Sequence, residues 1–407
     1  MKPSRFPALA LGLGAALLAA SAVQAAVTPE GDVSPGTGDA YWSTGGSGSQ
    51  AVSIGQSLPG SLTMNGGSTL ASGQVMIGTN GAAGGEVELS DAGTVWTISG
   101  DIYVGLLGGA LVEVMNGASV SAGYTAMGYY SGSTGKIVVK GAGSQWSASS
   151  VVIGSTGNAV INVTDSGKVA TSGDFYVQGG SGVGILNLGV SSNSALVEAG
   201  GTFTNNGTVN VFALGNLAGG NYNPVTAGAL AGSGTVNSWG GTVAEGTGVF
   251  TVSSYTEYTD AIVGQDLSGA RVNAGDGALV VAFADNAGTG NLELTEVESP
   301  LPSGYSYYEV VQIDMSGLIN SEIILSYELG AGVDEDNIYA WKLVGENWQE
   351  INLDDTLATY EQEYFNMMVD GGGVYALGVA VPEPSTYAAL FGAGVLAFVG
   401  LRRRRRA

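Results

Sequence analysis

Five consecutive segments, beginning near residue 61 and ending near residue 184, repeat one pattern with a period of about 25 residues. Each segment opens on alternating apolar residues, passes through a turn that carries Asn or Asp, and closes on apolar residues before a glycine. A repeat of this length buries its apolar face only by stacking on its neighbours, so the chain must build an elongated array. The residues that mark the pattern are, in the turns, Asn65, Asp91, Asn116 and Asp165, and, at the closing glycines, Gly78, Gly105, Gly128, Gly154 and, less regularly, Gly179.

Period-2 alternation and abundant glycine predict short strands joined by tight turns. The chain has 69 glycines in 407 residues, and glycine costs about 1 kcal/mol in a helix interior while it permits turns with φ > 0. We therefore expect an all-β protein in which residues 51–252 form a parallel β-helix of about eight coils, with about 25 residues per coil. A β-sandwich or a propeller is the alternative, although a propeller blade takes about 40 to 50 residues.

The composition changes after residue 252, where glycine becomes rarer and acidic and aromatic residues become more frequent. Residues 253–380 alternate well and predict a second, smaller β-sandwich-like domain. Its order of strands, acidic loop and final glycine-led strand resembles β-sandwich modules near the C-termini of prokaryotic surface proteins. Residues 26–50 precede the repeats and are expected to form an N-terminal cap or linker that covers one end of the array.

The first 25 residues have the three parts of a secretory signal peptide. Lys2 and Arg5 precede an apolar stretch over residues 8–20, and small residues place the cleavage site between Ala25 and Ala26. A membrane-spanning helix needs roughly 20 apolar residues, and this stretch has only about 13. The chain is therefore expected to be exported and to be processed by signal peptidase.

The C-terminus, residues 381–407, also has three parts. Pro382, Glu383 and Pro384 come first, an apolar run follows over residues 387–401, and a basic cluster ends the chain. The run would form a helix of about 22 Å against a hydrocarbon core of about 30 Å, so it is a marginal transmembrane helix. The basic cluster would stay in the cytoplasm, which places the rest of the chain across the membrane. The cluster consists of Arg402, Arg403, Arg404, Arg405 and Arg406.

This tripartite tail resembles the PEP-CTERM sorting signal of Gram-negative bacteria. The resemblance implies recognition by an exosortase-type membrane enzyme, cleavage near Pro382 to Pro384, and a surface or extracellular-matrix destination, often among exopolysaccharide. It also implies a transient inner-membrane anchor through the C-terminal helix, and an ordinary membrane anchor is the alternative. Residues 229–252 resemble the Gly-rich repeats of autotransporter passengers and of other PEP-CTERM proteins.

Without the two terminal segments the body is strongly acidic. It retains 34 acidic and 5 basic residues, a formal charge of −29. Such a body does not bind nucleic acid or an anionic membrane, because phosphate binding needs clustered Lys and Arg. Divalent cations and neutral glycans are the partners that this charge allows. Exopolysaccharide and other surface proteins are the partners expected at the cell surface.

Several residue types of common catalytic sites are missing, although the 34 acidic residues leave many carboxylate pairs of the kind that glycosidases use, none of them singled out by the sequence. The chain has no His and no Cys, no Gly-x-Ser-x-Gly elbow and no phosphate-binding loop. Lys136, Lys140 and Lys168 would form a small cationic patch if they shared one face, although solvated charges are the simpler interpretation. Trp96 and Trp146 recur two repeats apart, and we interpret them as turn-packing aromatics rather than as a sugar platform.

One acidic stretch has the donor type that Ca²⁺ prefers. Asp334 and Asp336, with Glu335, Asn337 and the later pair Asp354 and Asp355, offer clustered oxygen donors. A solvated acidic loop is the simpler interpretation, and no other cofactor is expected.

The sequence thus predicts an exported, non-enzymatic surface or matrix protein with a structural or adhesive role. The alternative is a glycan-binding or polysaccharide-degrading protein that uses the β-helix face.

Overall fold

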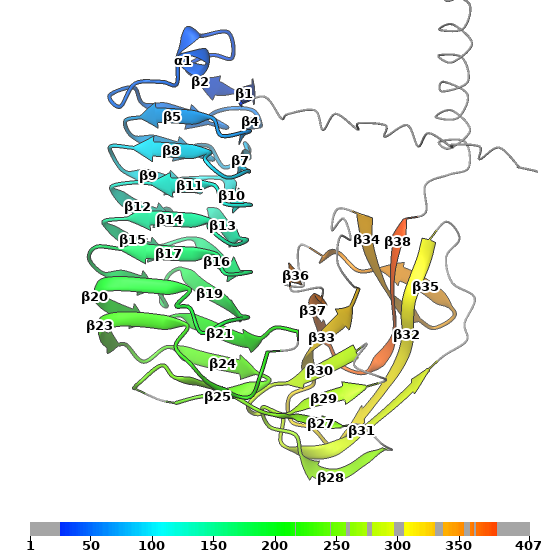
Figure 1. Cartoon of the computed structure of the whole chain (residues 1–407). Coiled ribbons are helices and arrows are strands. Elements are labelled where there is room, and N and C mark those ends of the chain that lie inside the picture. Colours follow the sequence, from blue (N-terminus) through cyan, green and yellow to red (C-terminus); the bar gives the residue numbers. More distant parts are fainter. Residues whose placement is uncertain are drawn as a thin grey trace, which may run out of the picture.

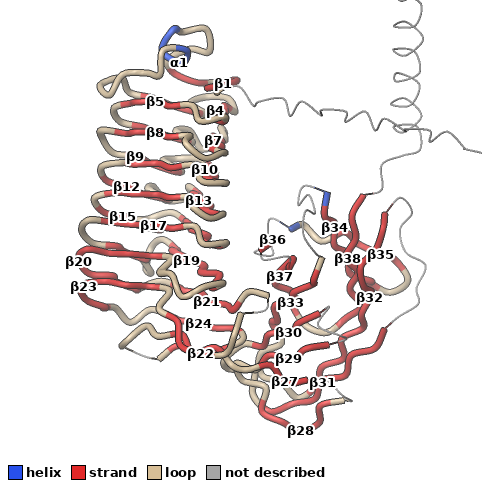
Figure 2. Tube along the Cα trace, in the orientation of Figure 1, coloured by secondary structure: helices blue, strands red, loops and turns tan. Residues whose placement is uncertain are grey.

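The computed structural model describes residues 25–380 except residues 216, 245, 258–260, 275–278, 297–304, 330–336, 354–358 and 362–363. Nearly all secondary structure in this part of the chain is β, as expected, and α1 (Ala40–Ser43) is its one short α-helix. Figure 1 shows a stack of coils with a second β domain beside its C-terminal end. Figure 2 shows the same arrangement as a tube, with α1 at the N-terminal end of the stack.

The first part is a β-solenoid of about seven turns, and most of its coils contribute three strands. The first strand of each coil joins one parallel sheet. Its members are β4 (Gly60–Asn65), β7 (Gly85–Leu89), β10 (Gly109–Met115), β13 (Thr134–Lys140), β16 (Asn158–Thr164), β19 (Val183–Val190), β21 (Thr208–Ala213) and β24 (Thr235–Trp239).

The other two strands of each coil form two parallel strips, which β20 (Val197–Asn205) joins into one sheet. One strip contains β5 (Thr69–Ser72), β8 (Val95–Ile98), β11 (Ser119–Ser121), β14 (Gln145–Ala148) and β17 (Lys168–Thr171). The other contains β3 (Val52–Ile54), β6 (Val75–Ile77), β9 (Ile102–Val104), β12 (Tyr124–Met127), β15 (Ser150–Ile153) and β18 (Phe175–Val177), and β23 (Val225–Ala231) extends the sheet beyond β20.

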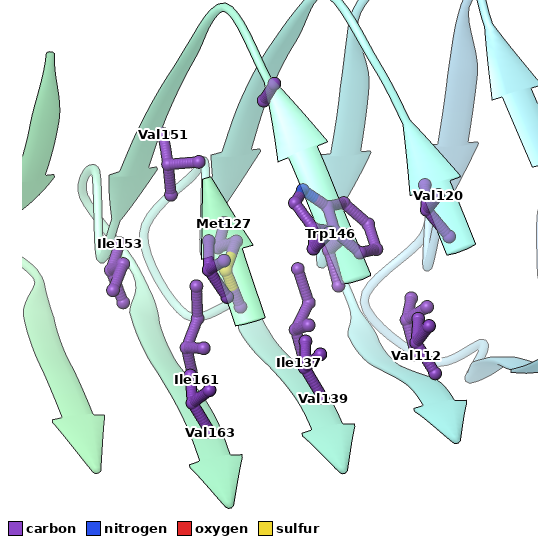
Figure 3. Close-up of a cluster of buried hydrophobic side chains, with 14 of the residues drawn as sticks. Val112, Val120, Met127, Ile137, Val139, Trp146, Val151, Ile153, Ile161 and Val163 are labelled. Atoms are coloured by element: carbon purple, nitrogen blue, oxygen red, sulfur yellow. The ribbon is translucent and has the colours of Figure 1, made fainter. Parts of the chain in front are cut away.

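The register explains the repeat that the sequence shows. Leu62 pairs with Val87, Val87 with Val112, and each apolar residue continues onto its equivalent in the next coil. These inward side chains are fully buried and form one continuous core, part of which is seen in Figure 3. The estimate of eight coils is slightly high because β22 (Gly220–Tyr222), β25 (Gly241–Val243) and β26 (Phe250–Val252) leave the solenoid pattern and form a small antiparallel sheet.

The closing glycines of the repeat are required by their backbone geometry. Gly78, Gly105, Gly128 and Gly154 all have φ between +54° and +74°, a region that costs other residues energy. A Cβ on Gly105 would also lie only 2.3 Å from the carbonyl oxygen of Thr134 in the next coil. Glycine at this position therefore allows both the turn and the close approach of successive coils.

Trp96 and Trp146 are core residues rather than turn residues, so that part of the sequence interpretation was wrong. They lie on β8 and β14, pair with Val120 from either side, and are 0 % exposed. Each indole N–H donates within the interior, to Ser72 Oγ at 3.0 Å and to Thr125 Oγ1 at 3.2 Å. Buried at this depth, neither ring is accessible to a sugar.

An asparagine ladder runs along the outside of the first sheet. Asn187 donates from its side-chain nitrogen to Asn162 Oδ1 at 2.8 Å, Asn210 donates to Asn187 at 2.7 Å, and Asn237 donates to Asn210 at 2.9 Å. Each side-chain amide is therefore hydrogen-bonded to its equivalent in the neighbouring coil, over four consecutive coils. These bonds stabilise the C-terminal half of the sheet.

The N-terminal residues cover the first coil. β1 (Ala26–Gly31) pairs antiparallel with β4, and β2 (Val33–Ser34) pairs antiparallel with β3. β1 includes Pro29, which lacks an N–H and suits the outermost strand of a sheet. Tyr41 and Trp42 of α1 are buried, and the Tyr41 hydroxyl donates to the Ala71 carbonyl at 2.8 Å.

The remaining residues form two six-stranded sheets, here called the two-sheet domain, that share one core cluster. The inner sheet contains β27 (Tyr255–Glu257), β29 (Arg271–Ala274), β30 (Leu279–Phe283), β33 (Glu322–Glu328), β36 (Thr359–Glu361) and β37 (Tyr364–Asp370). The outer sheet contains β28 (Ile262–Asp266), β31 (Thr289–Glu296), β32 (Tyr305–Ser316), β34 (Ile338–Val344), β35 (Asn347–Glu350) and β38 (Gly373–Ala380). Kinship with β-sandwich modules of surface proteins stays a prediction.

The inner sheet is buried on both faces because its second face packs on the end of the solenoid. Alternate residues of β30 and β33 point away from the domain core, and Ala282 and Ile324 contact Phe212 and Trp239 of the last coils. The backbone N–H of Gly215 donates to Asn366 Oδ1 on β37 at 3.0 Å. The solenoid and the two-sheet domain thus share a packed junction.

Candidate functional site

Several predicted site residues lie outside the described part of the chain. These are the sorting residues, with the apolar run between them and the basic cluster, and the acidic residues Asp334, Asp336, Asp354 and Asp355. Among the residues that the structure does describe, no three acidic, His or Cys side chains are grouped closely enough to hold a metal ion. The calcium site at Asp334 and Asp336 lies outside these residues and stays a prediction.

The predicted signal-peptide cleavage site adjoins the first strand. Ala26 is the first residue of β1 and pairs with Asn65 of β4. Removal of residues 1–25 would leave this strand complete. The cleavage position itself stays a prediction.

The three solenoid lysines do not share one sheet. Lys136 and Lys140 lie on β13 of the first sheet, whereas Lys168 lies on β17 of the second. Lys168 forms an ion pair with Glu198 at 2.7 Å. The small cationic patch that would need all three lysines on one face is therefore not formed.

The structure instead brings together four tyrosines, which we call the tyrosine patch. Tyr103 lies on β9, Tyr124 begins β12, and Tyr129 and Tyr130 follow the turn glycine Gly128. The Tyr103 and Tyr129 ring centroids are 5.1 Å apart at 86°, and those of Tyr129 and Tyr130 are 4.9 Å apart at 90°. These are edge-to-face contacts, a favourable arrangement for aromatic rings.

Backbone bonds between coils hold the patch in position. The N–H groups of Tyr129 and Tyr130 donate to the carbonyls of Gly105 and Leu106 in the preceding coil, at 3.0 Å and 3.2 Å. The Tyr129 carbonyl accepts from Thr156 Oγ1 of the following coil at 2.6 Å. The rings are thus mounted on a rigid part of the solenoid.

The patch combines burial with exposure. The pKa of Tyr124 is raised, and burial of its hydroxyl is the largest cause. It is raised further by the neighbouring phenols Tyr129 and Tyr103 and by the carboxylate of Asp101. Tyr130 is 48 % exposed, and Leu107, in the equivalent loop of the preceding coil, is 45 % exposed. The result is an accessible surface of phenol rings on a supported base.

Two carboxylates flank the patch along the solenoid. Asp101 accepts from the backbone N–H of Tyr124 at 3.1 Å. Asp174, three coils further on, accepts from the Thr202 N–H at 2.8 Å and from the Tyr176 hydroxyl at 2.8 Å. The Thr202 N–H and then the Tyr176 hydroxyl lower the pKa of Asp174. Both carboxylates are therefore held in fixed orientations.

A cavity of about 600 Å³ lies among the last coils. Its lining is mainly apolar side chains, including Phe203, Val209 and Val225, with backbone from the following loops. The amide of Asn205 is already bonded, donating to the Thr235 carbonyl at 3.0 Å and accepting from the Gly207 N–H at 3.1 Å. The cavity thus offers volume but few converging polar groups.

Arg271 is a buried cation that sequence reasoning did not single out. It is 1 % exposed, and its guanidinium donates to the carbonyls of Leu217, Gly215 and Ser253. Burial lowers its pKa to about 10. Because the three carbonyls come from the end of the solenoid and the segment after it, Arg271 fastens the two-sheet domain to the stack.

The tail of the chain matches a known protein-family model. The model of the PEP-CTERM protein-sorting motif matches residues 380–405. The chain carries a PEP-CTERM sorting motif. This motif implies an exported, envelope-associated protein that is processed by an exosortase-type enzyme.

Searches of curated proteins and of solved structures found no significant match to the chain. In the described residues, no helix has the length and hydropathy needed to cross a membrane. The apolar run at residues 387–401 lies beyond them, so the proposed membrane helix stays a prediction.

Proposed function

We propose that this chain is a non-enzymatic structural or adhesive component of the cell surface or extracellular matrix. The observation that carries the proposal is the PEP-CTERM motif at residues 380–405, attached to a rigid solenoid. A solenoid with a continuous buried core offers a long surface that keeps its shape. The chain has no His and no Cys, so catalysis that depends on an imidazole or a thiolate is excluded.

The position of the motif favours release of an intact body. β38 lies between β32 and β34 in the outer sheet and ends at Ala380, where the matched motif begins. Cleavage near Pro382 to Pro384 would therefore remove no described strand. In this proposal the inner-membrane anchor is transient, and the released body associates with exopolysaccharide or with other surface proteins.

Mass spectrometry of the mature protein from its native organism tests the sorting step. We expect a C-terminal peptide that ends near Pro382 to Pro384. A variant with Ala at Pro382, Glu383 and Pro384 should keep Arg402 to Arg406 and remain in the membrane fraction. A control with Ala at Ser385 and Thr386 should be processed normally, and an intact tail in the unaltered protein would refute exosortase processing.

A gene deletion tests the structural role. We expect the strain without this protein to make a mechanically weaker surface layer or matrix, restored by the full chain. Incubation of purified protein with polysaccharides should release no soluble product. Release of sugar would replace the non-enzymatic proposal with the polysaccharide-degrading alternative.

A further inference from the structure

We propose that the tyrosine patch binds a neutral polysaccharide. This inference names a ligand class for the adhesive role proposed above and so rests on it. It begins with the chemistry of the rings. A phenol offers an apolar face, on which the C–H groups of a sugar ring stack, and a hydroxyl that bonds to sugar hydroxyls. Tyr103, Tyr129 and Tyr130 bring three phenols together within two successive coils, and the ring of Tyr130 is 48 % exposed.

The patch is preorganised, which lowers the entropic cost of binding. Gly128 has φ +54°, and a Cβ there would lie 2.4 Å from the Asn158 carbonyl oxygen, so the turn that presents Tyr129 and Tyr130 has one well-defined conformation. Bonds to coils on both sides fix the same backbone. The backbone that carries the rings therefore needs little ordering when a ligand arrives.

The flanking carboxylates extend the surface along the solenoid. Asp101 and Asp174 are three coils apart, or about 14 Å at the usual strand spacing. Each already accepts a backbone N–H, which leaves further oxygen lone pairs for sugar hydroxyls. A chain of several sugar units, rather than a single sugar, fits a surface of this length.

Charge decides which glycan the patch accepts. The body carries a formal charge of −29, and the lysines nearest in sequence, Lys136 and Lys140, lie on the first sheet rather than beside the rings. Uronate-rich or sulfated chains would be repelled by this field, as would a second copy of the protein. An uncharged polysaccharide meets no such barrier.

A second aromatic group in the molecule is less suitable. Tyr305, Tyr339 and Trp341 gather on the outer sheet with ring centroids 4.6 to 6.0 Å apart. However, Trp341 is only 4 % exposed. Its ring is used for packing, whereas Tyr130 is half exposed.

Affinity electrophoresis of the full chain tests the proposal. Native gels would contain soluble xyloglucan, galactomannan or dextran, with alginate as the anionic probe. We expect at least one neutral polysaccharide to retard the protein and alginate to leave its mobility unchanged. Tyr130→Ala should weaken retardation about tenfold, the size expected for the loss of one well-placed aromatic contact. Tyr130→Phe should keep most of it.

Leu58→Ala is the matched control, because Leu58 is 67 % exposed in the equivalent loop of the first coil but lies away from the rings. It should leave retardation intact. No retardation by any neutral polysaccharide, equal loss in Leu58→Ala, or equal retardation by alginate would overturn the inference. So would a dimer that Tyr130→Ala dissociates without any effect of glycan. None of these outcomes alters the C-terminal peptide, so failure here is distinct from failure of the sorting proposal.

Discussion

The solenoid and the two-sheet domain both bury their strands, but they pair them differently. In the solenoid each strand pairs in parallel with a strand about one repeat away, so every coil contacts only its neighbours. In the two-sheet domain most pairs are antiparallel, and strands far apart in sequence meet, as when β32 pairs with β38. The solenoid therefore depends on the same turn glycine and inward apolar residues in coil after coil. The two-sheet domain depends instead on a few contacts that are not repeated.

The largest expected effect is at a repeat glycine of the solenoid. Gly105→Ala should lower the free energy of unfolding by about 3 to 5 kcal/mol, because it combines positive φ with a Cβ that meets a carbonyl of the next coil. Gly132→Ala is the control, since Gly132 has φ +81° but nothing within 4 Å of a Cβ; it should cost about 1 kcal/mol. Urea unfolding measures the free energy of unfolding of both variants. Equal losses would show that the close approach of successive coils is not what requires glycine at residue 105.

The next effect is at the junction of the two parts. Arg271→Met should cost about 3 kcal/mol, because it leaves buried carbonyls without their shared donor. It should also split thermal unfolding into two calorimetric transitions, one for each part. Lys168→Met removes only an exposed ion pair with Glu198 and should cost under about 1 kcal/mol. A single unchanged transition in Arg271→Met would mean that apolar packing alone couples the two parts.

A smaller effect compares one amide in each part. Asn187→Ala breaks two ladder bonds and should cost about 1 to 2 kcal/mol. Asn286→Ala removes a similar amide bond with Asn320, but at an exposed position of the two-sheet domain, and should cost about 0.5 kcal/mol or less. Chemical denaturation distinguishes them. Similar losses of unfolding free energy in the two variants would show that the continuity of the ladder adds no stability.

The smallest effect concerns acid. In the N-terminal residues that cover the solenoid, bonds from the backbone N–H groups of Leu58 and then Ser57 lower the pKa of Asp32. In the solenoid itself, the Thr202 N–H and then the Tyr176 hydroxyl lower the pKa of Asp174. A lowered folded-state pKa contributes stability that is complete above the usual value of 3.8 and is lost as the pH falls through the lower folded value. Because the chain has no His, we expect melting temperature to change little from about pH 6 to 8.

Asp174→Asn checks this assignment. Its melting temperature should lie slightly below that of the unaltered protein at pH 6, and the two values should converge below pH 3.8. A constant difference across this range would place the contribution of Asp174 in packing rather than in charge.

The sequence was sufficient for the solenoid because its signal is repeated. One inward apolar position recurs as Leu62, Val87 and Val112, so the pairing partner of each residue can be read from the period. The asparagine ladder could also have been predicted from the sequence, because four asparagines recur at nearly the same interval. They are Asn162, Asn187, Asn210 and Asn237. The tyrosine patch left a weaker signal, because its rings occupy different positions of two adjacent repeats.

Other features had no counterpart in the sequence pattern. Trp96 and Trp146 were assigned to turns because a period alone does not say which part of a coil faces inward. The partners of Arg271 are backbone carbonyls of distant residues, and every residue has such a carbonyl, so no residue type marks them. The double burial of β30 and β33 likewise depends on where the solenoid ends.

The sequence by itself determined the sorting motif, the all-β class and the coil length, because each is encoded in a short segment or in a regular period. Only the tertiary structure decided which tyrosines meet, which tryptophans are enclosed, and how Arg271 joins the two parts. Those features depend on contacts between residues far apart along the chain, and such contacts exist only once the coils have stacked and the two sheets have closed on their end.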